Sequence, residues 1–360
     1  MHHELPSPRE EKSIEKVKEG RVQLPPLVSI VIPAYNAAGT IEETLHSACA
    51  QTWRDLQIIV VDDGSNDETA EIVRRLADRD CRIRLVQTPN RGVAAARNEG
   101  IRASRAEYIA MLDADDLWHP TKIERQMQVM LAGPVQPGFV YCLYRNITAT
   151  GCVTYSSAAV ECRGNVLARH AYMNFVGNGS ALLLRRAAIE AAGGYDPGLR
   201  ARGIEGCEDL LLQLRIASRF NVDCVPEYLV GYRQHVAMMS FDQARMLRSR
   251  RAALALVREV APDVPEYVFR WSVAQQLFRT ALSNAGQRRW GGAARMLALS
   301  ILNDPLAAWP KLWALLQPSP EAKLRFADYL PSQDTVPPSR LLAFRLRRLA
   351  KIDNVPDTSR

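Results

Sequence analysis

The sequence predicts an α/β fold with a mainly parallel sheet, followed by an all-helical unit. Four short apolar segments, residues 28–32, 56–61, 83–86 and 108–112, each run directly into a polar cluster. Segments with helical periodicity separate most of these strands, and such alternation is typical of βαβ units with parallel strands. From residue 243 to residue 316, Ala, Leu and Arg recur at helical spacing, which predicts helices only.

Three helices are predicted between the four strands. Residues Thr40–Glu43 form a capping-box pattern before the apolar residue Leu45, and Ser65–Glu68 repeat this pattern before Ile72. Gly92 opens the third helix. Further elements are expected in a strand at 139–144, an irregular β-prone stretch at 146–162, an apolar run at 181–184, a turn at 193–197, a helix at 210–218 and a strand at 228–232.

Composition and charge limit the class of protein. The chain has 360 residues, 47% hydrophobic and 24% charged, and no run of 18 apolar residues, so no membrane-spanning helix is expected. Residues 1–20 are charged and lack the apolar segment of a secretory signal, which predicts a disordered tail. The seven cysteines lack the close pairing of a zinc site, and we interpret them as reduced thiols of a cytoplasmic protein.

The net charge of +7 is uneven along the chain. Residues from Phe241 onward hold 19 Lys and Arg against 10 Asp and Glu, whereas the preceding part holds 27 against 29. No nucleic-acid-binding motif accompanies the basic part, so a membrane surface or another anionic partner fits better than DNA or RNA.

Polar clusters that follow parallel strands predict a ligand site, because ligands of open α/β sheets bind beyond the carboxyl ends of the strands. The strongest cluster is Asp113-Ala-Asp115-Asp116. Carboxylates at alternate positions can present oxygen ligands to Mg²⁺ or Mn²⁺. The alternative is a solvated turn that caps the next helix, and we assign Asp116 to that role.

The other strand ends carry groups that suit a nucleotide. A carboxylate of the Asp62-Asp63 pair could accept a hydrogen bond from a base or ribose, and Tyr35, after Pro33, could stack on a base. Arg91 and Arg97 flank a helix N-terminus, which suits phosphate. Helix capping, a core tyrosine and solvated surface cations are the respective alternatives. Neither the G-x-G-x-x-G fingerprint nor a Walker A sequence occurs.

Two later clusters complete the candidate site. Glu208-Asp209 precede an apolar helix, where a carboxylate could act as a general base or simply cap the helix. Arg233 and His235 follow the strand at 228–232 and could close over a diphosphate, although a lone histidine is more often an ordinary surface or core residue.

Residues 27–240 resemble a family 2 glycosyltransferase of the GT-A fold. The resemblance rests on the order and spacing of segments 28–36, 51–52, 61–67, 90–92, 96–98, 108–116, 193–196, 208–209 and 232–235. It implies an inverting transfer from a nucleotide-diphosphate sugar, expected to be a UDP-sugar, to a glycan or lipid-linked acceptor of the cell envelope, assisted by Mn²⁺ or Mg²⁺.

The resemblance also implies roles for individual residues. Pro33, Tyr35 and Asp63 would bind the nucleoside. Arg91 is included among the donor-binding residues, and Arg233 and His235 match the loop that covers the diphosphate. Asp113 and Asp115 match the D-x-D motif, with Asp115 as metal ligand. Asp209, with Glu208 beside it, matches the general base.

Several expectations concern the whole chain. The Q-x-x-R-W motif of processive synthases is absent, because residues 286–290 are one residue short of that spacing, so addition of a single sugar is expected. We expect a tail at 1–26, a catalytic domain at 27–240, a helical domain at 241–316, and a linker with a short basic amphipathic helix at 317–360. That helix, residues 340–352, is expected to bind peripherally at the cytoplasmic face of a membrane, and packing on its own protein is the alternative.

Two other functions remain open. A sugar-1-phosphate nucleotidyltransferase has a similar sheet, but its G-x-G-x-R loop is missing here. A catalytically inactive scaffold on the same fold would be expected to lack Asp115 or Asp209, and both are present. For residues 290–305, half of a tetratricopeptide hairpin and part of a plain helical bundle are equally good interpretations.

Overall fold

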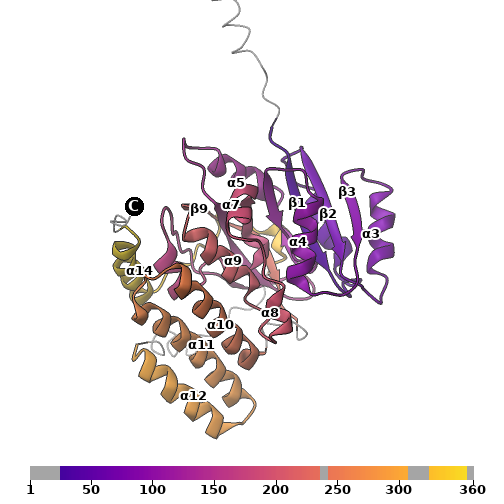
Figure 1. The fold of residues 1–360 in the computed structure, drawn as a ribbon. Coiled ribbons are helices and arrows are strands. Elements are labelled where there is room, and N and C mark those ends of the chain that lie inside the picture. Colours follow the sequence, from indigo (N-terminus) through magenta and orange to yellow (C-terminus); the bar gives the residue numbers. More distant parts are fainter. Residues whose placement is uncertain (1–24, 236–241, 307–323, 355–360) are drawn as a thin grey trace, which may run out of the picture.

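The computed structural model describes residues 25–235, 242–306 and 324–354. A nine-stranded mixed sheet forms its centre, in the order β3-β2-β1-β4-β8-β6-β9-β5, with β7 paired to β6 (Figure 1). The predicted tail lies outside these residues except for its last two positions. All seven cysteines are free, and four of them are buried.

The first half of the sheet is parallel. It consists of β1 (Val28–Ala34), β2 (Leu56–Asp62), β3 (Ile83–Gln87) and β4 (Tyr108–Met111). Helices α2 (Ile41–Cys49), α3 (Thr69–Ala77) and α4 (Val93–Ala103) connect them, as the alternating pattern predicts. Strands β1, β2 and β4 are buried almost throughout, which explains their continuous apolar runs.

The second half of the sheet is mostly antiparallel. Strand β8 (Leu182–Arg185) joins β4 to β6 (Phe139–Ile147), and the long β9 (Val222–Arg233) runs parallel to β6. The short strands are β5 (Leu117–Trp118) and β7 (Val153–Ser156), and the remaining helices of this part are α5 (Lys122–Met130), α6 (Leu167–Tyr172), α7 (Arg186–Ala191), α8 (Gly198–Ala201) and α9 (Glu208–Ala217).

Neither capping box forms. The Thr40 hydroxyl donates to the carbonyl oxygen of Ala114 at 2.9 Å, and no side chain caps the first turn of α2. Helix α3 begins only at Thr69. Ser65 therefore lies outside the helix, and its hydroxyl accepts a hydrogen bond from the backbone N–H of Asn36. Both hydroxyls therefore join distant loops, because partners that the fold brings in compete with local caps.

Helices α10 (Gln243–Val260), α11 (Glu266–Gly286) and α12 (Trp290–Asn303) lie side by side in Figure 1. Helix α10 packs against α9, α11 against α6, and α12 against α11. Hydrophobic residues of α6 and α9 share one core with those of α10 and α11, so the helices are joined to the sheet through α6 and α9.

Residues 324–338, which the sequence suggests are a linker, instead lie against the sheet. Phe326 is 5% exposed and packs with Ile147 and Val153. The buried guanidinium of Arg145 stacks on Tyr329 at 4.3 Å from the ring centre. The proline and serine content therefore marks an irregular segment that is nevertheless packed.

The basic helix α14 (Arg340–Asp353) packs on its own protein. Leu349 is fully buried, and the carboxylate of Asp353 accepts hydrogen bonds from Ala168 N–H and Arg169 Nε, both at 2.6 Å. Arg345 is buried and paired with Asp304. Most apolar residues of α14 are therefore already packed on the protein, which is the alternative to the predicted membrane contact, although Phe344 is 61% exposed.

Candidate functional site

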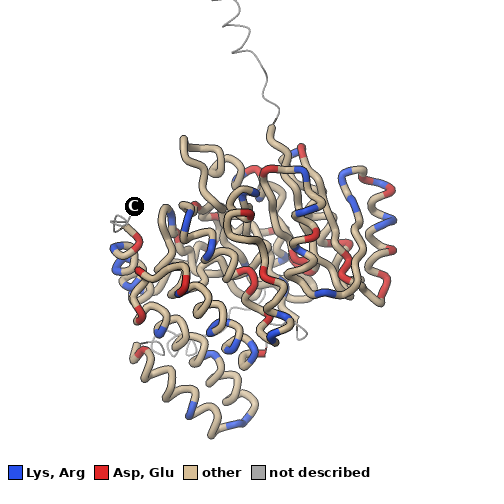
Figure 2. Tube along the Cα trace, in the orientation of Figure 1, with Lys and Arg blue, Asp and Glu red and all other residues tan. Residues whose placement is uncertain are grey.

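The carboxyl ends of the parallel strands bring the candidate residues together. Strand β1 pairs with β2 in a register that sets Ala34 opposite Asp62, and β4 lies on the other side of β1. Tyr35, Asp63 and Asp113, which follow these strands, therefore lie along one edge of the sheet. Figure 2 shows acidic residues at this lower end of the sheet.

A buried arginine joins two of the predicted carboxylates. Arg97 on α4 donates from Nη2 to Asp113 Oδ1 at 2.7 Å, and its Nη1 lies 3.0 Å from Asp209 Oδ1. The guanidinium is 4% exposed, and the ring of Tyr195 lies 5.2 Å from its centre. The two acidic neighbours hold the pKa of Arg97 above its ordinary value despite burial. A permanent cation is thus fixed between the D-x-D motif and the candidate base.

Asp209 has the electrostatics of a base that works near neutral pH. Burial raises its pKa to about 6, and the charges of Asp113 and Glu208 raise it as well, while Arg97 lowers it. The side chain is still 23% exposed although Oδ1 is buried, so a ligand can reach the residue from one side. A carboxylate with such a pKa can accept a proton and remain largely ionised at pH 7.

Glu208 lies beside Asp209 in the sequence but points elsewhere. Its side chain is buried, and Oε1 accepts a hydrogen bond from Gly206 N–H at 2.8 Å. Successive residues in the first turn of a helix diverge by about 100°. Asp209 therefore contacts the Arg97–Asp113 pair, while Glu208 holds the loop before α9.

Asp115 faces His235. The distance from Asp115 Oδ2 to His235 Nε2 is 2.8 Å, and both side chains are partly exposed. Burial and the charge of Asp113 raise the pKa of Asp115, whereas the contact with His235 lowers it. The contact is a hydrogen bond between the two side chains, so both point to the same place and could reach one ion, whose neighbouring ligands lie about 3 Å apart.

A metal ion at Asp115 would have at most two protein side chains as ligands. In residues 25–235, 242–306 and 324–354, no group of three or more His, Cys, Asp or Glu side chains is arranged to hold a metal. One or two protein ligands, with donor phosphates completing the shell, are nevertheless typical for Mg²⁺ in phosphate chemistry. Asp115 and His235 fit that arrangement.

Asp116 does not cap a helix in solvent, and that prediction is wrong. Its side chain is fully buried, its Oδ2 accepts from the Ser180 hydroxyl at 2.6 Å, and its Oδ1 accepts from Arg233 N–H at 3.0 Å. Ser180 Oγ in turn accepts from Asp113 N–H. Asp116 thus ties the loop after β4 to the start of β8 and the end of β9.

Arg233 holds the backbone of the loop after β4. The guanidinium is buried, with Nε donating to the carbonyl oxygen of Asp115 at 2.7 Å and Nη2 paired with Glu43 at 2.6 Å. Nη1 donates to the carbonyl oxygens of Thr148 and Ala149. In this conformation the arginine orients the backbone of Asp115 and has its donors engaged within the protein.

Asp63 is similarly engaged. Its Oδ1 accepts from Arg91 N–H at 2.9 Å, and its Oδ2 accepts from Gly92 N–H at 2.7 Å, just before α4 begins. Its carboxylate therefore shapes the loop that leads into α4. Gly92 adopts φ +91°, which favours glycine.

The side chains of Tyr35 and Arg91 extend into solvent. Tyr35 is half exposed directly after β1, whereas Pro33 is buried within that strand. Arg91 is also more than half exposed and lies 3.8 Å from Glu99. These two side chains are available to a ligand, while Pro33 can contribute only through the position of the strand.

Sequence reasoning did not assign Asn98 or Ser180. Asn98 donates from Nδ2 to the carbonyl oxygen of Tyr195 at 2.8 Å and accepts from Tyr195 N–H at 3.0 Å. The pair of bonds fixes the turn whose tyrosine covers Arg97. The only signal for Ser180 is the polar run 177–180 directly before an apolar strand.

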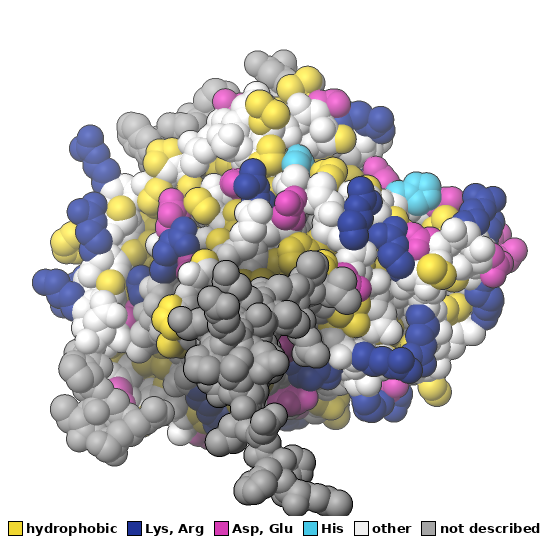
Figure 3. Space-filling model, turned by 90° about the horizontal axis from the view of Figure 1, so that it is seen from above, with side chains coloured by type: hydrophobic (Ala, Val, Ile, Leu, Met, Phe, Trp, Pro, Cys, Tyr) yellow, Lys and Arg dark blue, Asp and Glu magenta, His cyan; other side chains and the backbone are white. Residues whose placement is uncertain are grey.

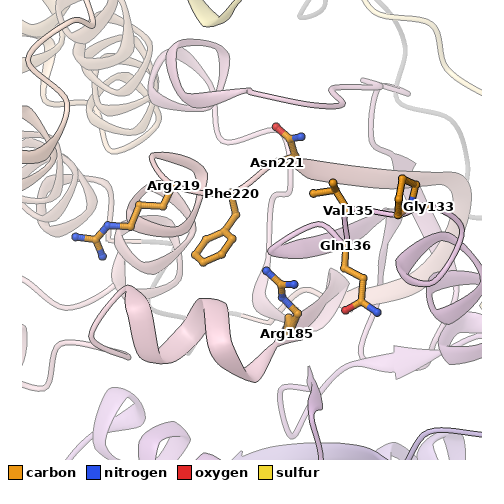
Figure 4. Close-up of a pocket in the computed structure, with 8 residues that line it drawn as sticks. Gly133, Val135, Gln136, Arg185, Arg219, Phe220 and Asn221 are labelled. Atoms are coloured by element: carbon orange, nitrogen blue, oxygen red, sulfur yellow. The ribbon is translucent and has the colours of Figure 1, made fainter. Parts of the chain in front are cut away.

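A cavity of about 560 Å³ lies away from this site, between Val135, Gln136, Arg185 and Phe220 (Figure 4). Arg185 pairs with Tyr108, the first residue of β4, whereas Asp113 follows the last. The cavity is therefore at the opposite edge of the sheet and includes none of the candidate residues.

One segment of the chain matches a known protein family. Residues 29–154 match the family model "Glycosyl transferase family 2". An uncharacterised glycosyltransferase of Haemophilus influenzae is 40% identical over 107 residues, which are 29% of this chain and 43% of that protein. The putative teichuronic acid biosynthesis glycosyltransferase TuaG of Bacillus subtilis is 40% identical over 107 residues, 29% of this chain and 42% of TuaG.

A hyaluronan synthase of Pasteurella multocida is 35% identical over 135 residues, 38% of this chain and 14% of the synthase. The chain thus matches less than half the length of each of these relatives. Among solved structures, TarS 1–349 of S. aureus in complex with UDP-GlcNAc has a TM-score of 0.52 at 14% identity, covering 76% of this chain and 90% of that one. This likeness establishes the GT-A type of the fold.

Proposed function

Since residues 29–154 belong to glycosyltransferase family 2, we propose that this protein transfers a sugar from a nucleotide-diphosphate donor to an acceptor hydroxyl with inversion of configuration. The observation that carries the proposal is the fixed cluster of Asp113, Arg97 and Asp209 at the carboxyl ends of the parallel strands. Ligands of open α/β sheets bind at that edge.

Asp209 is proposed to remove the proton of the acceptor hydroxyl. Its pKa of about 6 makes it mostly ionised at pH 7 and still basic enough to accept a proton as the hydroxyl oxygen attacks. Attack from the face opposite the leaving diphosphate inverts the configuration at the anomeric carbon. Arg97 holds the carboxylate in place and stabilises its ionised form.

The donor is proposed to be a UDP-sugar, the class of ligand present in the TarS complex. Tyr35 is exposed at a strand end, where its ring can stack on a base, and Arg91 can reach a phosphate. Asp63 holds the backbone of Arg91 and Gly92, and Arg233 holds that of Asp115. We therefore assign these two residues to donor binding through the loops they position.

Mn²⁺ or Mg²⁺ is proposed at Asp115, with His235 as its neighbour in the site. When bound there, the ion supplies positive charge that stabilises the departing diphosphate. The chain orients Asp115 for this role. Arg233 Nε donates to the carbonyl oxygen of Asp115, and the carboxylate of Asp116 accepts from the backbone N–H of Arg233. Asp113 is already paired with Arg97 and is proposed to face the sugar.

The remaining parts of the proposal concern the acceptor and the chain as a whole. We propose addition of one sugar to a glycan or lipid-linked acceptor in cell-envelope polysaccharide synthesis, at or near the cytoplasmic face of a membrane. We also propose residues 27–240 as the catalytic domain and 241–316 as a helical domain. Among the described residues, no helix is both long and apolar enough to cross a bilayer.

A screen of nucleotide sugars tests the proposal. The full-length protein is incubated with each donor and Mn²⁺, and released nucleoside diphosphate is measured. We expect release from one donor class, with a large loss in Asp209→Asn. Glu208→Gln is the matched control, because a glutamine oxygen can still accept from Gly206 N–H. A folded protein that releases no nucleotide from any donor, with or without candidate acceptors, would contradict the proposal.

A further inference from the structure

Helix α12 exposes a continuous apolar face. Trp290 is 68% exposed and Leu302 is 78% exposed, although both are large hydrophobic residues. At about 100° per residue, the exposed side chains of one face recur over the full length of the helix. They are Trp290, Ala294, Leu297, Ala298, Ile301 and Leu302.

The opposite side of α12 packs against α11. Ser300 is fully buried and donates to the carbonyl oxygen of Ala274 at 2.8 Å, within α11. Figure 1 places α12 at the outer margin of the helices, with α11 between it and α10. Soluble proteins rarely leave such a patch without a partner, so a partner for this face is expected.

Charge indicates which partner fits. Residues 267–303 contain five arginines and no acidic residue. Arg288 and Arg289 stand at the start of α12, and Arg295 stands on the flank of the apolar face, all three exposed. A second copy would bring the same patch against itself in a two-fold dimer, so these cations would meet without counter-charges. An anionic surface has the complementary charge.

Helix α14 extends the basic surface. The exposed residues of α14 recur at helical spacing as Arg340, Phe344, Arg347, Arg348 and Lys351. Arg345, on its inner side, forms a buried ion pair with Asp304 immediately after α12, with Nη2 to Oδ1 at 2.6 Å. The two helices are therefore held together where the apolar face of α12 ends.

The opposite side of the molecule differs. Figure 3 views it from the end opposite α12, and on the part that is visible basic and acidic side chains are interspersed. In contrast, α12 lies on the lower side of Figure 1, toward which the carboxyl ends of the parallel strands point. The exposed apolar face of α12, with exposed arginines beside it, thus differs from the mixed charge of the opposite side.

We propose that α12 is a membrane-contacting element: its apolar face inserts among the lipids of an anionic bilayer, while Arg288, Arg289 and Arg295 contact the headgroups. Helices with tryptophan and leucine on one face and arginine beside it bind in this way at the bilayer interface. Basic residues near an anionic leaflet add to the affinity, and salt weakens that part. This inference does not depend on the proposed glycosyl transfer.

Vesicle co-sedimentation tests the proposal with the full-length protein. We expect binding to vesicles of phosphatidylglycerol and phosphatidylcholine in equal parts, weak binding to phosphatidylcholine alone, and a decrease with added salt. Leu297→Ser/Leu302→Ser should lower the partition coefficient at least about tenfold, since two exposed apolar side chains no longer insert. Leu302 is 78% exposed but Leu297 only 37%, so circular dichroism and thermal unfolding are measured to check that the fold survives.

The control is Val135→Ser/Leu330→Ser, which removes two apolar side chains outside α12 that are 72% and 68% exposed and should leave binding unchanged. Equal loss in both double variants, or no binding by the wild type, would overturn the proposal. So would binding that depends only on α14, which Arg347→Glu/Arg348→Glu would reveal. Size-exclusion chromatography tests the alternative occupant: a dimer that the α12 variant dissociates, without vesicle binding, would assign this face to self-association.

Discussion

Replacing Arg97 by glutamine should move the pH dependence of the reaction toward higher pH. Arg97 is the cation that faces Asp209, with Nη1 at 3.0 Å from Oδ1. The other groups around Asp209 are Asp113, Glu208 and Tyr195. The two carboxylates disfavour ionisation of Asp209, so removal of the cation leaves burial and repulsion unopposed.

The size of the shift follows from the geometry. An opposite charge at this distance usually lowers a carboxyl pKa by about 1–3 units, so its loss should raise the pKa of Asp209 by a similar amount. With a pKa of about 6, Asp209 is ionised in about nine-tenths of molecules at pH 7. After a rise of about 1 unit the ionised fraction is about one half, and after about 2 units it is about one tenth.

The assay is the pH profile of kcat/KM for nucleotide release, measured at saturating Mn²⁺. In the wild type, activity should rise with pH through about 6, because the base must be deprotonated. In Arg97→Gln the midpoint should move upward and activity should partly recover at pH 8–9.

Arg97→Lys is the matched control, because it keeps the charge and loses the two-pronged geometry. It should keep the midpoint near that of the wild type even if its maximal rate is lower. An unchanged midpoint in a folded Arg97→Gln protein would refute the electrostatic coupling. A uniform loss of rate at every pH would leave Arg97 a purely structural role.

Other substitutions test the remaining assignments. Asp115→Asn should lower Mn²⁺-dependent nucleotide release at least about 100-fold, as loss of the metal's charge stabilisation implies, without a change in circular dichroism; near wild-type release would reject the metal role. Glu208→Ala should cost about 1–3 kcal/mol in urea unfolding, because Gly206 N–H loses its acceptor; a larger loss of activity than in Asp209→Asn would show that the base is misassigned. Arg345→Ala should lower the free energy of unfolding by about 3–5 kcal/mol, since it leaves Asp304 buried and unpaired. The double variant Arg345→Met/Asp304→Asn should lose less. Equal free energies of unfolding for the wild type, Arg345→Ala and the double variant would contradict the burial of this pair.

The sequence predicted the positions of the parallel strands and their polar ends because both depend on local patterns. The buried runs of β1, β2 and β4 are continuous in the sequence, and Asp113 and Asp115 lie within the segment that matches the family model, whereas Asp209 lies beyond it. The family comparison and the GT-A type of the fold confirm the resemblance on which these assignments rest.

The direction of each side chain could not be predicted. Asp115 and Asp116 are adjacent, yet Asp115 is partly exposed and faces His235, whereas Asp116 is buried against Ser180, 64 residues away. Arg233 and Asp63 carry charges that suit a phosphate or a nucleoside, but their partners are Glu43 and backbone groups brought in by the fold. These pairings depend on tertiary contacts that no local pattern encodes.

The two outer helices show the same limit. The periodicity of residues 340–352 permits packing on protein or on lipid, and the burial of Leu349 together with the pairings of Arg345 and Asp353 selects the first for its inner side. Residues 290–305 are predicted as part of a helical hairpin or bundle, and neither pattern indicates that one face of α12 is exposed. Exposure depends on what surrounds a helix, which its own sequence does not contain.

The stereochemistry of the first-formed sugar tests the central claim most directly. With the α-linked donor identified by the screen, time-resolved proton NMR follows the anomeric proton of the product as nucleoside diphosphate is released. Base-assisted attack through Asp209 predicts the β-anomer first, and this product should disappear in Asp209→Asn. First formation of the α-anomer, or an unchanged rate in Asp209→Asn, would contradict a single-displacement mechanism with Asp209 as its base.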